Sequence, residues 1–273
     1  MIEYLYLGRM GYGEGLRLQA EIAEMRREGR VENVLLLLEH PPVLTLGRNA
    51  RRENVLASDE LLASRGVELH EINRGGDVTY HGPGQLVGYP IFDLRSLHNA
   101  RGGRLGPVDF VRMMEEALIR LCGVYGVRAG RIAGLTGVWC GVHDMNPSGE
   151  RKIGAIGIHV SRGITSHGFA FNVTTDLRDF QLINPCGITD KPVTSLEREV
   201  PEGVSVPGLE EIAHEAARRF GQIFGQQVLA VESPDALREQ ACGPKQNTVE
   251  DTPMEVPDEV RRLHGDPERP VRA

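Results

Sequence analysis

The sequence of 273 residues lacks any apolar run of the roughly 20 residues that a membrane-spanning helix needs. Its first ten residues, MIEYLYLGRM, also lack the basic flank and apolar core of an export signal. We therefore expect a cytoplasmic protein that does not bind a membrane.

An excess of positive charge is missing as well, because the formal net charge is −7. Proteins that bind nucleic acid as their main partner present a broad basic surface that displaces counterions. The charge balance therefore predicts no nucleic-acid partner, although a local basic patch remains compatible with it.

Paired cysteine motifs are absent too, since no CxxC or CxxH spacing occurs. This absence weakens a structural zinc site. Cysteines scattered through a chain without an export signal do not indicate a disulfide framework. Each must be judged separately; they are Cys122, Cys140, Cys186 and Cys242.

What is present is an ordinary globular composition, 40% hydrophobic and 25% charged. Helical spacing of apolar residues predicts helices at 16–29, 108–124 and 209–225. Short β-prone runs predict strands at 2–7, 31–40, 43–48, 67–74, 136–142, 151–163 and 166–173. We expect an α/β fold, a mixed sheet flanked by helices, without a repeated βαβ unit.

The C-terminal stretch from Pro244 is rich in proline and charge and poor in large apolar residues. Such a segment buries too little surface to offset its ordering entropy. The composition predicts one catalytic domain over residues 1–242 and a flexible tail over residues 243–273.

The most unusual stretch is RGGDVTYHGPGQL, residues 74–86, with four glycines around one histidine. Glycine leaves no side chain between the backbone and a ligand, so these residues can form a wall along a substrate; tight turns are the alternative. His81 can carry a proton or can simply make a core hydrogen bond. The spacing matches neither common phosphate-binding glycine motif.

Two further residues are candidates for chemistry. Cys186 lies in NPCG, between turn-forming residues that can present a small side chain at a surface. Lys152 precedes the apolar run IGAIGIHV, where a lysine is ordinarily a solvated charge. If the fold brings the two together, the ammonium favours thiolate over thiol and activates the cysteine as a nucleophile.

The stretch RGGDVTYHGPGQLVGYP, residues 74–90, resembles the signature of the lipoyl(octanoyl) transferases. RKIGAIGIHVSRGITSHGFAFNV, residues 151–173, and INPCGI, residues 183–188, resemble the same family in the same order. The resemblance extends from about Tyr4 to Gly225. It implies the α/β fold of biotin and lipoate protein ligases and a transferase that needs no cofactor or metal.

In that family the matching cysteine carries the acyl group as a thioester and the matching lysine activates it. The resemblance thus implies Cys186 as nucleophile and Lys152 as activator, with His81 as a third catalytic candidate. The substrate-contacting segments correspond to Arg74, Gly75, Gly76, Asp77, Val78, Thr79, Tyr80 and His81, to Ala155, Ile156 and Gly157, and to Gly168, Phe169 and Ala170.

The resemblance also implies two protein substrates. Octanoyl-acyl carrier protein is the donor, and the acceptors are the lipoyl domains of 2-oxoacid dehydrogenase complexes and the glycine cleavage H protein. Because carrier proteins are acidic, we expect a local basic docking patch on a chain that works as a monomer. Its candidates are Arg48, Arg51, Arg52 and Arg74.

Three alternatives remain open. The first is an ATP-dependent lipoate or biotin protein ligase, which shares the fold but needs no nucleophilic cysteine. The second is a non-catalytic module that binds an acyl chain or a lipoyl domain. The third is a metal site, which the spacing disfavours because no two of its ligands are positioned locally; they would be His81, His159, His167 and Cys186.

Overall fold

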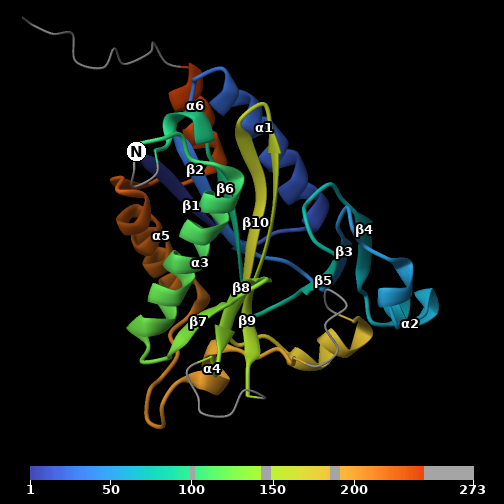
Figure 1. The fold of residues 1–273 in the computed structure, drawn as a ribbon. Coiled ribbons are helices and arrows are strands. Elements are labelled where there is room, and N and C mark those ends of the chain that lie inside the picture. The colour runs from blue at the N-terminus through green and yellow to red at the C-terminus, as the bar shows by residue number, and fades with distance from the viewer. Residues whose placement is uncertain (99–101, 143–148, 185–190, 243–273) are drawn as a thin grey trace, which may run out of the picture. The chain divides into compact units, whose positions relative to one another are not determined.

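An eight-stranded mixed sheet forms the centre of the fold in this computed structural model, which describes residues 1–98, 102–142, 149–184 and 191–242 (Figure 1). The strand order is β11-β1-β2-β6-β10-β9-β8-β7; β11, β1 and β2 run parallel, and the remaining neighbours are antiparallel. The strands are β1 (Ile2–Arg9), β2 (Asn33–Glu39), β6 (Gln85–Ile91), β7 (Ala129–Ile132), β8 (Leu135–Cys140), β9 (Arg151–Ser161), β10 (Ile164–Asn172) and β11 (Val228–Ala230). The expected mixed sheet is confirmed.

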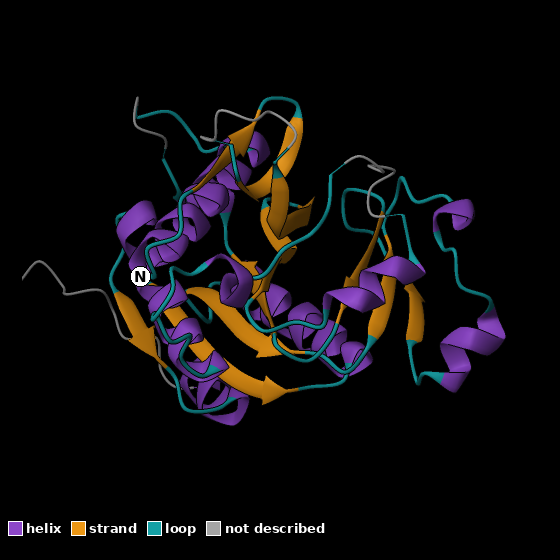
Figure 2. Ribbon diagram, turned by 90° about the horizontal axis from the view of Figure 1, so that it is seen from below, coloured by secondary structure: helices purple, strands orange, loops and turns teal. Residues whose placement is uncertain are grey.

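A second sheet of three strands has the order β4-β3-β5 and lies beside the first (Figure 2). Its strands are β3 (Val43–Leu46), β4 (Glu68–Glu71) and β5 (Val78–His81). The apolar runs predicted β3 and β4. They did not predict β5 and β6, which begin within the glycine-rich stretch, because glycine and proline are depleted in ordinary strands.

Helices cover both faces of the large sheet (Figure 1). α3 (Pro107–Val124) and α5 (Leu209–Phe224) pack on one face around an aromatic core that includes Phe110 and Phe220. α1 (Tyr12–Arg27) and α6 (Pro234–Cys242) bury apolar side chains in the core on the opposite face. The central residues 34–38 of β2 are all apolar and buried, as expected of a strand covered on both sides.

The three predicted helices are confirmed, with α1 beginning four residues earlier than its apolar spacing indicated. Short helical segments complete the described chain: η1 (Arg52–Asn54), α2 (Asp59–Ser64), η2 (Leu94–Ser96), η3 (Leu177–Leu182) and α4 (Leu196–Glu199). In the part of the chain that the structure describes, none of the helices is both long and apolar enough to cross a membrane.

Candidate active site

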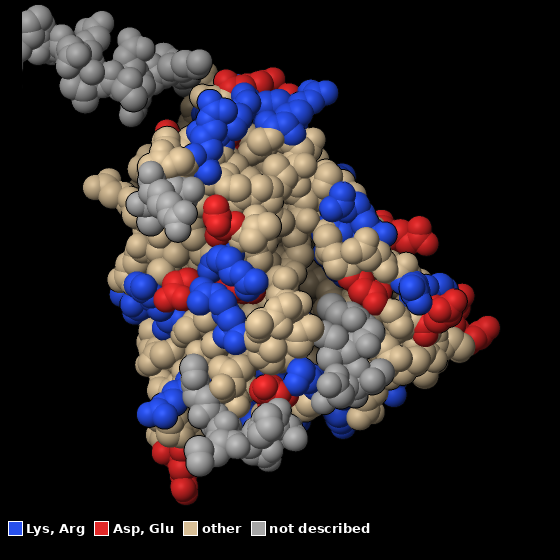
Figure 3. Space-filling view, viewed as in Figure 1, with Lys and Arg blue, Asp and Glu red and all other residues tan. Residues whose placement is uncertain are grey.

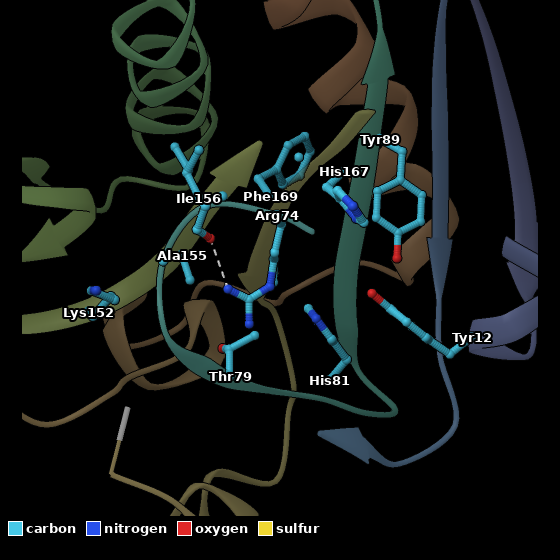
Figure 4. Close-up of a pocket in the computed structure, with 15 residues that line it drawn as sticks. Tyr12, Arg74, Thr79, His81, Tyr89, Lys152, Ala155, Ile156, His167 and Phe169 are labelled. Carbon is cyan, nitrogen blue, oxygen red and sulfur yellow. Dashed lines mark hydrogen bonds between the residues drawn. The ribbon is translucent and has the colours of Figure 1, made fainter. Parts of the chain in front are cut away.

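A pocket of about 540 Å³, open to solvent, lies between the glycine-rich segment and strands β9 and β10 (Figure 4). The three segments predicted to contact substrate, 74–81, 155–157 and 168–170, all contribute residues to its walls, and so does Lys152. Figure 4 shows Lys152 at one side of the pocket and Tyr12, Tyr89 and His167 at the other.

Strands β9 and β10 form the floor, because their register puts the two predicted triplets opposite each other. Residues 155–157 pair with residues 170–168 in an antiparallel ladder. Ile156 and Phe169 pack into the core on the α3 and α5 side. Since side chains alternate between the faces of a sheet, the small residues at 155, 157, 168 and 170 face the pocket and leave room above the sheet.

The segment 74–76 approaches this floor closely. The N–H of Gly75 donates to the carbonyl of Ile158 over 2.9 Å. A Cβ on Gly157 would lie 2.7 Å from the carbonyl oxygen of Gly75, closer than a real Cβ can come. Gly157 thus permits backbone-to-backbone contact, a different use of glycine from the substrate wall that the sequence indicated.

Arg74 connects the segment 74–76 to the smaller sheet through hydrogen bonds to Thr45 of β3. Its guanidinium donates to the carbonyl oxygen of Thr45 over 2.7 Å and to the Thr45 hydroxyl over 2.9 Å. The side chain is buried although it lines the pocket. Arg74 therefore does not belong to an exposed docking patch, which corrects one of the four expected members.

Three predicted substrate contacts do not line the pocket: Asp77, Val78 and Tyr80. The Asp77 carboxylate accepts a hydrogen bond from Asn54 Nδ2 over 2.5 Å. The Tyr80 hydroxyl donates to Asp179 over 2.8 Å. Along β5, Thr79 and His81 face the pocket, so the period of two turns the side chains of Val78 and Tyr80 to the opposite side.

His81 is buried and neutral. Gln85 Nε2 donates to Asn172 Oδ1 over 2.9 Å, so Gln85 Oε1 accepts from His81 Nδ1 over 2.8 Å. Burial, with the nearby His40, lowers the pKa of His81 to about 3. Its free Nε2 can accept a hydrogen bond in the pocket, but proton uptake at neutral pH is unfavourable. The catalytic role of His81 stays a prediction, and a neutral ring is better suited to accept a hydrogen bond than to carry a proton.

Tyr12 was not expected in the pocket. It is the first residue of α1, and its ring contacts those of His40, His70 and His81 at centroid distances of 5.1, 5.0 and 6.1 Å. The only local signal is GYGEG, a glycine-rich loop between a strand and a helix. Tyr89 was missed as well; its hydroxyl donates to His40 Nε2 over 2.6 Å.

Burial also lowers the pKa of His40 and of His167 to about 4. His40 Nδ1 donates to the carbonyl of Met10 over 2.7 Å, which fixes its tautomer. His167 Nε2 bonds Asn73 Oδ1 over 2.7 Å. Together with His81, these rings form a group of three buried, neutral histidines: His81 and His167 line the pocket, and the His40 ring lies 6.1 Å from that of His81.

We expect this histidine group to make stability depend on pH. Unfolded histidines bind protons below pH about 6.5, whereas the folded ones resist protonation down to about pH 4. Their contribution is complete above pH 6.5 and is lost as the pH falls toward 4, at about 1.4 kcal/mol per pH unit for each histidine. Urea unfolding between pH 4.5 and 7.5 measures the slope. His81→Gln should reduce this slope by the contribution of one histidine, about 1.4 kcal/mol per pH unit. An unchanged slope would contradict the assignment of a neutral, buried His81.

The Lys152 backbone holds the chain that follows Cys186. Lys152 N–H donates to the carbonyl of Pro192 over 2.8 Å, and Thr194 N–H donates to the carbonyl of Lys152 over 2.9 Å. The Lys152 Nζ lies 4.6 Å from the centre of the Trp139 ring. Cys186 itself lies outside the described residues.

The other three cysteines differ from one another in exposure. Cys122 and Cys140 are buried in the core, and burial raises the pKa of the Cys122 thiol. Cys242, the last residue of α6, is exposed. Cys242 is therefore the accessible thiol among these three.

The remaining basic candidates are exposed near the glycine-rich segment. Arg48 and Arg51 are on the surface, and Arg52 forms an ion pair with Asp59. On the face in Figure 3, basic and acidic side chains are interspersed. Any docking patch here is therefore local, as the net charge indicated.

Among residues 1–98, 102–142, 149–184 and 191–242, no three His, Cys, Asp or Glu side chains gather closely enough to hold a metal ion. This range includes His81, His159 and His167, but not Cys186. The three histidines therefore do not form a metal site among themselves.

Comparison of sequences gives close relatives. Residues 11–218 match the lipoyl protein ligase A/B catalytic domain. An octanoyltransferase of Acidobacterium capsulatum is 62% identical over 241 residues, which cover 87% of this chain and 96% of the relative. An octanoyltransferase of Koribacter versatilis is 51% identical over 266 residues, 97% of this chain and 98% of the relative.

Comparison of structures gives the fold. A bipartite lipoate protein ligase from Thermoplasma acidophilum superposes with a TM-score of 0.65 at 18% identity, covering 88% of this chain and 91% of its own. A lipoate-protein ligase A bound with ATP superposes with a TM-score of 0.62 at 17% identity, covering 88% and 94%. The α/β fold is therefore that of lipoate protein ligases, as the sequence motifs implied.

Proposed function

The chain belongs to the lipoyl protein ligase A/B catalytic domain family, and from this premise we propose that it transfers octanoyl groups through a thioester on Cys186 with Lys152 as activator. Octanoyl transfer in protein lipoylation, from an acyl donor to lipoyl-domain acceptors, is the activity of this enzyme. The observation that carries the proposed mechanism is the position of Lys152 at one end of the pocket built by the signature segments.

The described residues on both sides of 185–190 support the proposal that Cys186 lies near the pocket and Lys152. Asn184 N–H donates to the carbonyl of Asn54 over 2.7 Å, and the Asn54 side chain binds Asp77, two residues before Thr79 in the pocket wall. Cys186 is two residues further on, within about 7 Å of the Asn184 Cα. On the other side, Val193 pairs with Lys152.

The proposed reaction has two balanced half-reactions. The Cys186 thiolate attacks the donor thioester, the C–S bond to the donor breaks, and the Lys152 ammonium protonates the departing thiolate. The acceptor amine then attacks the acyl-cysteine, its proton passes to the now neutral Lys152, and Cys186 leaves as a thiolate. The ammonium-thiolate pair is restored, so one lysine serves both steps.

The octanoyl chain fits the pocket floor in size. From Ala170, near Lys152, to His167, the strand advances three residues, about 10 Å. An extended octanoyl chain spans about 9 Å. With its carbonyl near Lys152, the chain would lie over Ala155, Gly157 and Gly168 and end near the histidine group.

For the partners, we propose octanoyl-acyl carrier protein as the donor and the lipoyl domains of 2-oxoacid dehydrogenase complexes and glycine cleavage H protein as acceptors. The exposed Arg48 and Arg51 near the glycine-rich segment suit an acidic carrier protein. We propose that the enzyme works as a monomer.

Intact-mass measurement tests the mechanism most directly. Incubation with octanoyl-acyl carrier protein, without an acceptor, should add one octanoyl group to the enzyme. Peptide mapping should place it on Cys186, and neutral hydroxylamine should release it as it releases thioesters. Addition of a lipoyl domain should discharge the adduct. An octanoyl group mapped to Cys122, Cys140 or Cys242 would contradict the proposal.

We also propose that residues 1–242 form the catalytic domain and residues 243–273 a flexible tail. Met1–Cys242 forms one compact unit, which supports this boundary. Removal of residues 246–273 should leave the transfer rate and the thermal midpoint nearly unchanged, because the segment lacks the apolar periodicity needed to pack on a core. A large loss of activity or solubility on truncation would show that the tail covers the site or an interface.

A further inference from the structure

We infer that Trp139, in β8, is a positioning residue that holds the Lys152 ammonium at the mouth of the acyl pocket. Lys152 Nζ lies 4.6 Å from the centre of the Trp139 ring, within the range of a cation-π contact. Trp139 itself is 1% exposed and does not line the pocket, so it would act through the lysine. The inference deepens the proposed function, because it rests on the role of Lys152 there.

A bulge in the ladder between β8 and β9 creates this contact. Val138 pairs with Gly154, and an unbroken antiparallel register would then pair Trp139 with Ile153. The register shifts by one residue, and Trp139 pairs with Lys152 instead. Directly opposed residues project on the same face of a sheet, so the shift sets the lysine against the indole ring.

Gly137 provides the space through which the lysine stem passes. Its φ of +127° lies in the region that favours glycine, and a Cβ there would lie 3.4 Å from Lys152 Cε and 2.6 Å from the carbonyl oxygen of Gly154. The Gly137 N–H donates to the buried carboxylate of Glu115, in α3, over 3.0 Å. β8 is therefore fixed at the point where the lysine crosses it.

Charged groups also lie on the elements that neighbour Lys152. Three described carboxylates there form ion pairs with arginines or with the other described lysine: Glu199 of α4 with Arg151, Glu150 with Lys191, and Glu115 with Arg112 and Arg131. Arg74, His81 and His167 share the pocket with Lys152 and add no negative charge. An aromatic face favours an ammonium and restricts where it can sit, which is what activation of a thiol requires.

The chain offers an unusually direct measurement, because Lys152, Lys191 and Lys245 are its only lysines. Lysine labelled with 13C at Cε gives three signals, and Lys152→Arg identifies one of them. In the wild type that signal should be shifted by the ring current of Trp139. In Trp139→Leu the shift should vanish and the titration midpoint of the signal should fall by about half to one and a half pH units.

A second measurement tests the effect on the cysteine. It follows the pH dependence of Cys186 alkylation in a Cys242→Ser background, which removes the exposed competing thiol. Trp139→Leu should raise the alkylation midpoint by a similar amount, and Trp139→Phe, which keeps a weaker aromatic face, should give an intermediate value. Val138→Ala, buried on the other face of β8, controls for lost packing and should move neither midpoint.

If Trp139→Leu and Trp139→Phe lower the thermal midpoint but leave both titrations at the wild-type values, Trp139 is a packing residue and the inference is wrong. Failure of the proposed function gives a different result. In that case Lys152→Ala leaves the Cys186 alkylation midpoint unchanged, while the lysine signals still report whether Trp139 holds the ammonium.

Discussion

Cys186→Ala is expected to lower the rate of octanoyl transfer by at least about a thousandfold and to give no octanoyl adduct. The alanine side chain cannot form a thioester, and neither Cys122 nor Cys140 can replace it, because both are buried in the core. Single-turnover transfer from octanoyl-acyl carrier protein to a lipoyl domain measures the loss. Circular dichroism and the thermal midpoint verify that the variant folds.

Two matched variants sharpen this test. Cys242→Ser removes the exposed thiol at the end of α6 and should keep the full rate, because that residue lies outside the pocket. Cys186→Ser should be severely impaired, since a lysine suited to stabilising a thiolate leaves a serine hydroxyl protonated near neutral pH. Full transfer activity in Cys186→Ala would overturn the covalent mechanism and leave the fold untouched.

The sequence predicted those elements whose apolar periodicity is strong. Helices α3 and α5 carry long one-sided apolar faces, and their boundaries are confirmed within a residue or so. The sequence did not indicate β5 and β6, because β5 is only four residues long within a glycine-rich segment and β6 contains Gly88 and Pro90. In this fold those residues serve close backbone contact and the pocket wall, so tertiary packing overrides the local preference.

The candidate site, like the fold, was predicted from the sequence only in part. The three predicted substrate-contacting segments, 74–81, 155–157 and 168–170, indicated most of the pocket wall, because a motif fixes residue types along one continuous stretch. Which side of β5 faces the pocket depends on strand register, and the predicted contacts Val78 and Tyr80 lie on the side away from it. Tyr12 begins α1, far from these segments in the sequence, and only the fold brings it to the pocket.

Register also explains why Trp139 could not be predicted as a neighbour of Lys152. Thirteen residues separate the two in sequence, and a regular hairpin ladder would have paired the tryptophan with Ile153. The contact depends on a bulge of one residue, which leaves no recognisable pattern in the sequence. Sequence motifs thus identify reactive residues more readily than the side chains that orient them.

Lys152→Ala is expected to slow acyl capture by about 10²- to 10⁴-fold while leaving the fold intact. The substitution removes the ammonium that stabilises the Cys186 thiolate, so the pH midpoint of Cys186 alkylation should rise by about one to three units. The Lys152 side chain lines an open pocket and is half-buried, so its loss removes little core packing. Alkylation rates across pH 5–10 and rapid-quench acylation measure the two effects.

Lys152→Arg separates the two roles of the lysine, because arginine keeps the charge but retains its proton at any working pH. Acyl capture should therefore be partly preserved, since a cation still faces the thiolate. Discharge to the lipoyl-domain amine should stay as slow as in Lys152→Ala, because no neutral base accepts the amine proton. Preformed acyl-enzyme mixed with lipoyl domain isolates that second step. Equal alkylation midpoints in wild type and Lys152→Ala, or rapid discharge in Lys152→Arg, would assign activation to another group around the pocket.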